Sequence, residues 1–318
     1  MIRTQKIVIV TGANSGIGKA ACFRFAMDGW TVVLACRDLE KAAVVREAIV
    51  RDTGNDAVEA MPIDLSSKAS IRAFAAAFEA TYDKLDVLVH NAAYFNHGEA
   101  FRLTDDGMEI TFATNVAGPF LLTRLLTGAL KRSDDPRVLN AGSNIVKHFF
   151  SPKRAIDLEH LHGSPEGRRP PSVYERYCES KMALLMLTFI MAERLATDGI
   201  SVNCIQISGA KMSKETLRKF SIRYRLVAWL QNRFFPAPET VAAAYHEITT
   251  SERFRGVSGQ YVSDKLEILV PAETENVGLR QQWRQVTGGA HYPAYARETE
   301  VQTRLWEACE AFARDMVR

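Results

Sequence analysis

Tyr177 and Lys181 are the residues whose types and spacing point most directly to chemistry. They stand four positions apart in a stretch with helical periodicity, so both side chains are expected on one face of a helix. A free tyrosine has a pKa of about 10, and a neighbouring ammonium stabilises the phenolate and lowers that pKa. The pair therefore predicts a phenol that transfers protons as a general acid or base. Because Tyr-x-x-x-Lys also occurs by chance in helices, the interpretation depends on the surrounding residues.

Ser143 and Asn115 are the polar residues expected to complete this site. Ser143 follows an apolar run of strand character, and ligands of open α/β sheets bind at the carboxyl ends of strands. Its hydroxyl can donate to a carbonyl oxygen on which negative charge develops. Asn115 interrupts a long helical stretch. Taken singly, the serine is typical of a strand-end turn and the asparagine of a weakened helix, so only their combination with the tyrosine–lysine pair indicates catalysis.

A glycine-rich loop, Thr11–Gly18, lies between the first expected strand and the first expected helix. Glycines allow a tight turn and a close approach of backbone to a pyrophosphate, and the helix amino terminus offers free N–H groups and a positive dipole end. Such triplets also mark plain turns, but this position favours a nucleotide. The residues assigned to cofactor binding here are Gly12, Asn14, Ser15, Gly16, Ile17 and Gly18.

Alternating strands and helices must position these groups. The expected strands are Ile7–Val10, Thr31–Cys36, Val58–Ile63, Leu85–His90, Arg137–Ala141, Ile200–Ile207 and a shorter one around Gln260–Ser263. The expected helices are Ser15–Met27, Asp38–Asp52, Ser66–Tyr82, Gly107–Lys131 and Ser172–Thr197. The pattern predicts an α/β fold of Rossmann type: a doubly wound, mostly parallel seven-stranded sheet with helices on both faces, in a single domain covering 1–318.

Thr11–Gly18 resembles the cofactor motif of the short-chain dehydrogenase/reductase family. The resemblance continues in the family's order through Asp64-Leu65, Asn91-Ala92-Ala93, Asn115, Asn140–Ser143 and Tyr177–Lys181, and covers at least residues 5–265. Ser258–Tyr261, Arg304–Glu307 and the long gap between Ser143 and Tyr177 resemble the retinol dehydrogenase-like branch. The resemblance implies a nicotinamide cofactor contacted by Tyr177 and Lys181, with Lys181 on its ribose. It also implies that Asn115 kinks its helix and holds a water in a proton relay.

The end of the second strand should select between the two nicotinamide cofactors, because it faces the adenosine ribose. Cys36 stands at the position where the family has an acidic residue for NAD, and Arg37 follows it. A guanidinium binds a phosphate bidentately, which favours NADP(H) over NAD(H). Alternatively, Arg37 only caps groups at the sheet edge. The resemblance further assigns Asp64 to the adenine, Asn91 to the fourth strand and the ribose, and Leu65, Ala92, Ala93, Gly209 and Ser213 to the cofactor.

The segment expected to choose the substrate is a lid at about 211–240, rich in cations and aromatics. Its composition favours a bulky lipophilic or polycyclic substrate, and the alternative is peripheral contact with a membrane surface. Ser151–Pro171 is expected to be an irregular flap beside Ser143. His160 and His162 lack the further ligands of a metal site, so none is predicted. A C-terminal extension is expected at about 265–318.

Composition limits the remaining alternatives. A net charge of +3 over 318 residues gives no reason to expect nucleic-acid binding, and no apolar run reaches the length of a membrane span. Five widely separated cysteines suggest reduced thiols, and with no signal peptide expected the location should be cytoplasmic. The sequence thus predicts an NADP(H)-dependent oxidoreductase, working as a reductase on a carbonyl. The alternatives are a biosynthetic tailoring enzyme (an epimerase or ketoreductase) and a non-catalytic NADP(H)-binding sensor. A homodimer through the two long helices is a further hypothesis.

Overall fold

The computed structural model describes residues 5–95, 101–163, 172–212, 229, 232–233, 235–273, 284–286 and 288–314. Its strands form one sheet in the order β3-β2-β1-β4-β5-β6-β7-β8-β9. Their bounds are β1 Ile7–Thr11, β2 Thr31–Cys36, β3 Val58–Pro62, β4 Val87–His90, β5 Arg137–Ala141, β6 Ser201–Gln206, β7 Tyr261–Ser263, β8 Ile268–Pro271 and β9 His291–Tyr292. The strands β1 to β7 pair in parallel, so their carboxyl ends meet along one edge.

The predicted Rossmann-type sheet is confirmed as a class, but it has nine strands in the described residues rather than seven. Strand β8 turns back antiparallel on β7, and β9 pairs in parallel with β8. The turn is held by Ser263, whose Oγ accepts from the backbone N–H groups of Lys265 and Glu267. The added strands have only four and two residues, which is too short for a periodic pattern in the sequence.

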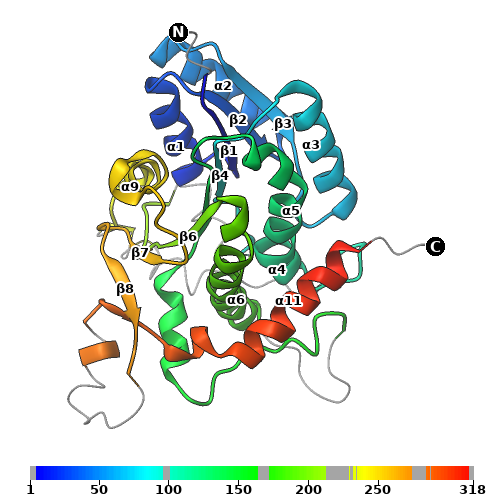
Figure 1. The fold of residues 1–318 in the computed structure, drawn as a ribbon, viewed down its shortest axis with the longest axis vertical. Coiled ribbons are helices and arrows are strands. Elements are labelled where there is room, and N and C mark those ends of the chain that lie inside the picture. Colours follow the sequence, from blue (N-terminus) through cyan, green and yellow to red (C-terminus); the bar gives the residue numbers. More distant parts are fainter. Residues whose placement is uncertain are drawn as a thin grey trace.

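Helices cover both faces of the sheet (Figure 1). One face carries α1 Gly16–Met27, α2 Leu39–Thr53 and α9 Pro238–Thr250, and the other carries α3 Lys68–Thr81, α5 Gly118–Lys131 and α6 Val173–Arg194. These helices bury their apolar sides in two clusters, one on each face of the sheet. The C-terminal helix α11, Thr299–Ala313, lies along α6 and α5, where Trp306 meets Phe120 edge-on.

The helix expected over Gly107–Lys131 is interrupted. It consists of a single turn, α4 Ile110–Phe112, then a π-helical turn, η1 Ala113–Ala117, and then α5. Buried Glu109 caps the first turn by accepting hydrogen bonds from the N–H groups of Thr111 and Phe112. Asn115, which the sequence marks as an interruption, lies inside this π-turn. Turns of this kind often occur at functional sites.

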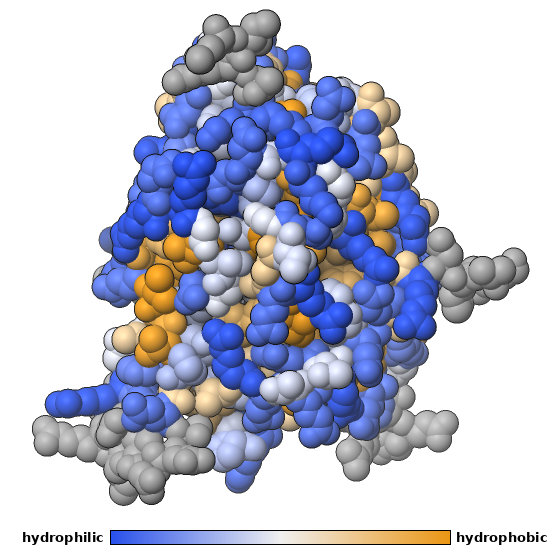
Figure 2. Space-filling view, viewed as in Figure 1, coloured by the Kyte–Doolittle hydropathy of each residue, from blue (hydrophilic) through white to orange (hydrophobic). Residues whose placement is uncertain are grey.

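Short helices complete the chain: η2 Asn144–Phe150, η3 Ala196–Asp198, η4 Glu252–Phe254 and η5 Ala294–Arg297. Residues 151–163, which follow η2, form no regular helix or strand, as expected for the flap. All five cysteines are buried and free. Among the described residues, no helix is long and apolar enough to cross a membrane. Hydrophilic residues cover most of the face seen in Figure 2, and apolar residues gather there in smaller patches.

Candidate active site

The loop between β1 and α1 has the geometry expected of a phosphate-binding turn. Gly12 adopts a left-handed backbone with φ of +67°. A Cβ added at Gly18 would lie 2.5 Å from the carbonyl oxygen of Gly12, so only glycine allows the helix to start this close to the strand. A Cβ at Gly16 would meet no atom within 4 Å, so the backbone there faces open space. An anion can therefore approach the loop and the amino end of α1.

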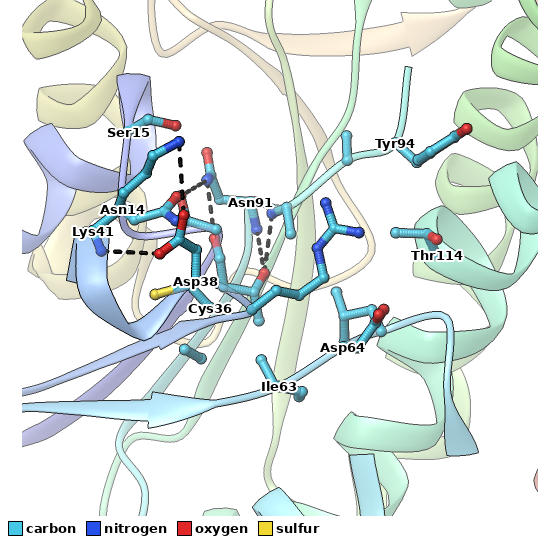
Figure 3. A pocket seen from close by; sticks show the side chains of 17 residues that line it. Asn14, Ser15, Cys36, Asp38, Lys41, Ile63, Asp64, Asn91, Tyr94 and Thr114 are labelled. Carbon is cyan, nitrogen blue, oxygen red and sulfur yellow. Dashed lines mark hydrogen bonds and ion pairs between the residues drawn. The ribbon is translucent and has the colours of Figure 1, made fainter. Parts of the chain in front are cut away.

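A cavity of about 520 Å³ runs from this loop along the carboxyl ends of the parallel strands. Figure 3 shows Asp38 and Lys41 on one side of it and Tyr94 and Thr114 on the other, with Asn91 between them. Of the residues predicted to bind a cofactor, those that line it are Gly12, Asn14, Ser15, Arg37, Asp64, Leu65, Asn91, Ala92 and Ala93. Its position matches the site where doubly wound sheets bind dinucleotides, because the strand order reverses between β1 and β4.

The end of β2 carries no carboxylate facing the cavity at the position of Cys36, whose side chain is buried. Burial raises the pKa of that thiol to about 11, so it stays uncharged. Arg37 and Lys41 both line the cavity. Asp38 caps α2 by accepting from the N–H of Lys41 and pairs with its ammonium at 3.6 Å. Lys41 was not predicted, although its place in the first turn of α2, four residues after Arg37, is a signal that spacing offers.

Asn91 is held by bonds at both ends of its amide. Its Nδ2 donates to the carbonyl of Thr11 at 2.9 Å, and its Oδ1 accepts from the hydroxyl of Tyr245 at 3.1 Å. The hydroxyl of Thr11 accepts from the N–H groups of Asn91 and Ala92, both at 3.0 Å. These bonds fix the loop after β4 against β1. The support of the fourth strand by Asn91 thus has a structural basis, and Thr11 and Tyr245 are contributors that the sequence did not single out.

Tyr177, Lys181 and Ser143 come together where β5 meets α6. The Nζ of Lys181 lies 5.7 Å from the centre of the Tyr177 ring and donates to the carbonyl of Ala141 at 2.8 Å. The hydroxyl of Ser143 lies close enough to the phenol of Tyr177 to favour its ionised form. The Oγ of Ser143 also accepts from the N–H of Ile145 at 3.3 Å, which leaves its proton free to be donated elsewhere. The two hydroxyls can therefore bind the same carbonyl oxygen.

Burial dominates the electrostatics of this pair. It raises the pKa of Tyr177 to about 12, with a further rise from Cys178, and the hydrogen bond with Ser143 opposes the rise. Burial also lowers the pKa of Lys181 to about 8. For the polypeptide alone, the expected lowering of the Tyr177 pKa is not found, because desolvation of the phenolate raises that pKa. The part of the expectation that depends on the cationic nicotinamide stays a prediction.

Asn115 joins two segments at the π-turn. Its Oδ1 accepts from the N–H of Tyr94 at 2.6 Å, and its Nδ2 donates to the carbonyl of Tyr94 at 3.1 Å and to the hydroxyl of Ser180 at 3.0 Å. Ser180 in turn donates to the carbonyl of Tyr177 at 2.9 Å. The asparagine is therefore connected, through the side chain of Ser180, to the helix that carries Tyr177 and Lys181.

Some predicted residues lie apart from the cavity or beyond the described chain. Gly16 lines a groove between α1 and α9 instead of the main cavity. Among the described residues, the lining of the main cavity also lacks Ile17, Gly18, Gly209, Tyr177 and Lys181. Ser213 lies outside the described residues, as does most of the expected lid. No group of three potential metal ligands occurs in the described part of the chain. His160 instead binds Asp157, and His162 the carbonyl of Gly107.

Comparison with known proteins finds relatives whose sequences are similar to this chain over most of its length. A family model for short chain dehydrogenases matches residues 6–151. Retinol dehydrogenase 13 of Mus musculus is 34% identical over 86% of this chain and 81% of its own. Retinol dehydrogenase 11 of Homo sapiens is 34% identical over 87% and 83%. Polyprenol dehydrogenase of Mus musculus is 31% identical over 95% and 82%.

Solved structures share the fold. A short chain dehydrogenase from Shigella flexneri in complex with NADP superposes with a TM-score of 0.63, at 22% identity over 82% of this chain and 97% of its own. One from Pseudomonas syringae has a TM-score of 0.62, at 24% identity over 81% and 94%. With sequence identity above 30% to relatives over most of both chains, the protein belongs to the short-chain dehydrogenase/reductase family of oxidoreductases, in its retinol dehydrogenase-like branch.

Proposed function

We propose that the protein is an NADP(H)-dependent oxidoreductase that interconverts a carbonyl and an alcohol on a bulky lipophilic substrate, working as a reductase. The observation that carries this proposal is the meeting of Tyr177, Ser143 and Lys181 at the carboxyl edge of the sheet that also borders the long cavity. The names of the relatives, retinol and polyprenol dehydrogenases, support a lipophilic alcohol or carbonyl as the substrate.

The residues of the cavity fit a dinucleotide that carries an additional phosphate. Gly12, Asn14 and Ser15 line the cavity where a pyrophosphate would lie, and Arg37 and Lys41 offer two cations beside the buried Cys36. A guanidinium and an ammonium would each bind a 2′-phosphate. Because Cys36 stands where a carboxylate would repel that phosphate, the position favours NADP(H). When bound, the nicotinamide supplies or accepts the hydride, and its oxidised form adds positive charge beside the phenol.

The side chains of the site then divide the work. Ser143 and Tyr177 donate to the carbonyl oxygen and stabilise the negative charge that develops on it. Tyr177 gives its proton to that oxygen. Lys181, buried and bound to Ala141, provides positive charge on the tyrosine's side and would bind the cofactor ribose. Asn115 supports the relay by which the proton of Tyr177 is replaced. Alcohol oxidation is the same sequence in reverse.

Two other functions remain to be separated from this one. A tailoring enzyme of the same family would use the same residues on a biosynthetic intermediate. A sensor would bind NADP(H) without turnover, and the presence of the tyrosine, lysine and serine together argues against it. The distinguishing assay follows NADPH absorbance with a panel of aromatic and polycyclic aldehydes and ketones. Turnover of bulky members supports the proposal, whereas tight NADPH binding with no turnover across the panel supports the sensor.

Cofactor choice is tested by the affinities for NADPH and NADH. We expect Arg37→Asp to raise the Kd for NADPH by about 10- to 100-fold, the loss of one charge-assisted phosphate contact, and to change the Kd for NADH much less. Lys41→Ala should have a smaller effect of the same sign. Arg51→Ala is the matched control, because Arg51 is an exposed arginine of α2, the helix of Lys41, and pairs with Asp52. If Arg37→Asp binds NADPH and NADH with the same Kd values as the wild type, Arg37 is not the residue that selects the cofactor.

Domain organisation, membrane contact and oligomeric state stay predictions. A single domain with a lid at about 211–240 and a C-terminal extension at about 265–318 is proposed from the sequence. Peripheral membrane contact through 211–236, a homodimer and a cytoplasmic location are likewise proposed from the sequence alone.

A further inference from the structure

The ring of Phe95 lies directly against the ring of Tyr177. Their centres are 4.2 Å apart, and the planes are inclined by 33°. Phe95 also lies 6.5 Å from the ring of Tyr174, which is one turn earlier on α6. Phe95 belongs to the loop after β4, so the contact joins segments that are far apart in the sequence. Aromatic rings at this distance attract each other beyond the effect of their buried area.

The backbone that carries Phe95 is fixed in place. The preceding residue, Tyr94, exchanges two hydrogen bonds with the amide of Asn115, at 2.6 and 3.1 Å. The same amide donates to Ser180, three residues after Tyr177 on α6. The loop and the helix of the catalytic tyrosine are thus tied through one asparagine, and the position of Phe95 relative to Tyr177 follows from this tie.

Tyr177 has polar as well as aromatic neighbours. Tyr174, which is partly exposed, bonds through its hydroxyl to Nε2 of His148 at 2.9 Å, and His148 belongs to η2, which follows Ser143. The phenol of Tyr177 itself has the hydroxyl of Ser143 as a polar neighbour. Tyr177 therefore has a polar neighbour in Ser143 and an apolar neighbour in the ring of Phe95.

We propose that Phe95 is a positioning and specificity residue for the reaction at Tyr177: its ring holds the phenol toward Ser143 and forms the apolar wall that the carbonyl substituent contacts. The proposal rests on the proposed function for its second half only. Phe95 supplies no proton and no charge. Its volume limits the size of the substituent, and its contact keeps water from one face of the phenol.

The positioning role is tested without any substrate, by titrating Tyr177 in protein labelled with ¹³Cζ-tyrosine and assigned with Tyr177→Phe. The ionisable or charged groups around the phenol are Cys178, Tyr174 and Lys181 on α6, Tyr245 on α9 and the hydrogen-bonding Ser143. Because burial holds the pKa of Tyr177 near 12, its signal in the wild type should not move up to pH 10.5. In Phe95→Ala, water reaches the ring, so the pKa of Tyr177 should fall by about one unit or more. The signal should then begin to move toward the phenolate value below pH 10.5.

Two further variants keep this test decisive. Phe95→Leu preserves most of the apolar volume but removes the ring, so it serves if Phe95→Ala does not fold. Phe23→Ala is the matched control, because Phe23 is a half-buried phenylalanine on α1, away from the site. A folded Phe95→Ala and Phe95→Leu whose Tyr177 signals titrate as in the wild type would overturn the positioning role.

The specificity role is tested by the ratio of kcat/KM for a polycyclic aldehyde to that for a small aldehyde. Phe95→Ala should raise this ratio by about tenfold and Phe95→Trp should lower it, because a change of pocket volume acts on the larger substrate. An unchanged ratio in both variants, with wild-type turnover intact, overturns the specificity role and leaves the proposed function standing. If the wild type turns over no carbonyl, the proposed function fails, and the titration alone still decides whether Phe95 positions Tyr177.

Discussion

At the scale of single residues, the site places two ionisable groups in surroundings that oppose their charged forms. Burial moves the pKa of Tyr177 up to about 12 and that of Lys181 down to about 8. A phenol in this state is a proton donor over the whole neutral range, which suits reduction of a carbonyl. It becomes a base only when an additional positive charge favours the phenolate.

The pH dependence of the two directions should therefore differ. Alcohol oxidation needs Tyr177 as phenolate, and the phenolate fraction rises about tenfold per pH unit below the pKa. We expect kcat/KM for oxidation to rise with pH from 6 upward, while kcat/KM for reduction does not rise over the same range. Initial rates in buffers of constant ionic strength measure both profiles. An oxidation rate that is flat between pH 6 and pH 9 would show that Tyr177 is not the titrating base.

The residue types of this site could be predicted from the sequence, but their electrostatic state could not. Spacing along a helix places Lys181 near Tyr177, yet it says nothing of the Ala141 carbonyl that accepts a hydrogen bond from the lysine's ammonium. Lys41 and Phe95 were missed for a similar reason. A cation in the first turn of a helix and an aromatic residue after a strand are common, and only the fold brings them to the cavity and to the tyrosine.

At the scale of elements, a buried arginine ties the flap to the helix of the active site. Arg176, the residue before Tyr177, donates to the carbonyls of Asp157 and His160 at 3.1 and 3.4 Å. It also pairs with Glu179 at 2.9 Å, one turn further along α6. Because two backbone carbonyls of the irregular segment accept hydrogen bonds from this arginine, Arg176 is one of the side chains that hold the segment against α6.

Replacing this arginine should loosen the flap. Arg176 is only 3% exposed, and its loss in Arg176→Ala leaves the buried carboxylate of Glu179 without its partner. We expect a loss of about 3 kcal/mol in the free energy of unfolding and faster hydrogen exchange in residues 151–163. Urea unfolding and peptide-resolved exchange measure the two effects. The matched control is Arg154→Ala, whose exposed pairing with Glu175 should be worth less than about 1 kcal/mol. Equal losses in both variants would contradict this role of Arg176.

The regular elements were predictable because their patterns are long. The strands β1 to β6 and the helices α1, α2, α3 and α6 lie close to the expected ranges. The π-turn at Asn115 and the short strands β8 and β9 could not be predicted. A single inserted residue or a two-residue pairing leaves no periodic signal in the sequence.

At the scale of the whole molecule, stability is linked to pH through a buried histidine in the sheet. His90 ends β4, is 2% exposed, and its Nε2 lies 2.7 Å from the hydroxyl of Thr123. Burial lowers its pKa to about 3. The unfolded chain binds a proton at this histidine below its ordinary pKa of about 6.5, whereas the folded chain does not. The contribution of neutral His90 to the free energy of unfolding is therefore fully present above pH 6.5, and it is lost as the pH falls toward 3.

The size of this effect can be measured by comparing variants. Between pH 7 and pH 5, His90 should remove about 2 kcal/mol from the free energy of unfolding, so the pH dependence of His90→Gln should be flatter by that amount. His162→Gln is the control, since His162 is exposed and should leave the dependence unchanged. Urea unfolding at the two pH values gives both slopes, and identical slopes for the wild type and His90→Gln would contradict the linkage.

The central claim is that Tyr177 transfers the proton in a nicotinamide-dependent reaction, and Tyr177→Phe tests it most directly. The variant removes one oxygen and leaves the ring against Phe95, so the fold and the cavity should stay intact. NADPH affinity by fluorescence titration should stay within about twofold of the wild type, while kcat for carbonyl reduction should fall by about 10²- to 10⁴-fold. A variant that binds NADPH normally and still reduces the substrate at the wild-type rate would contradict the account.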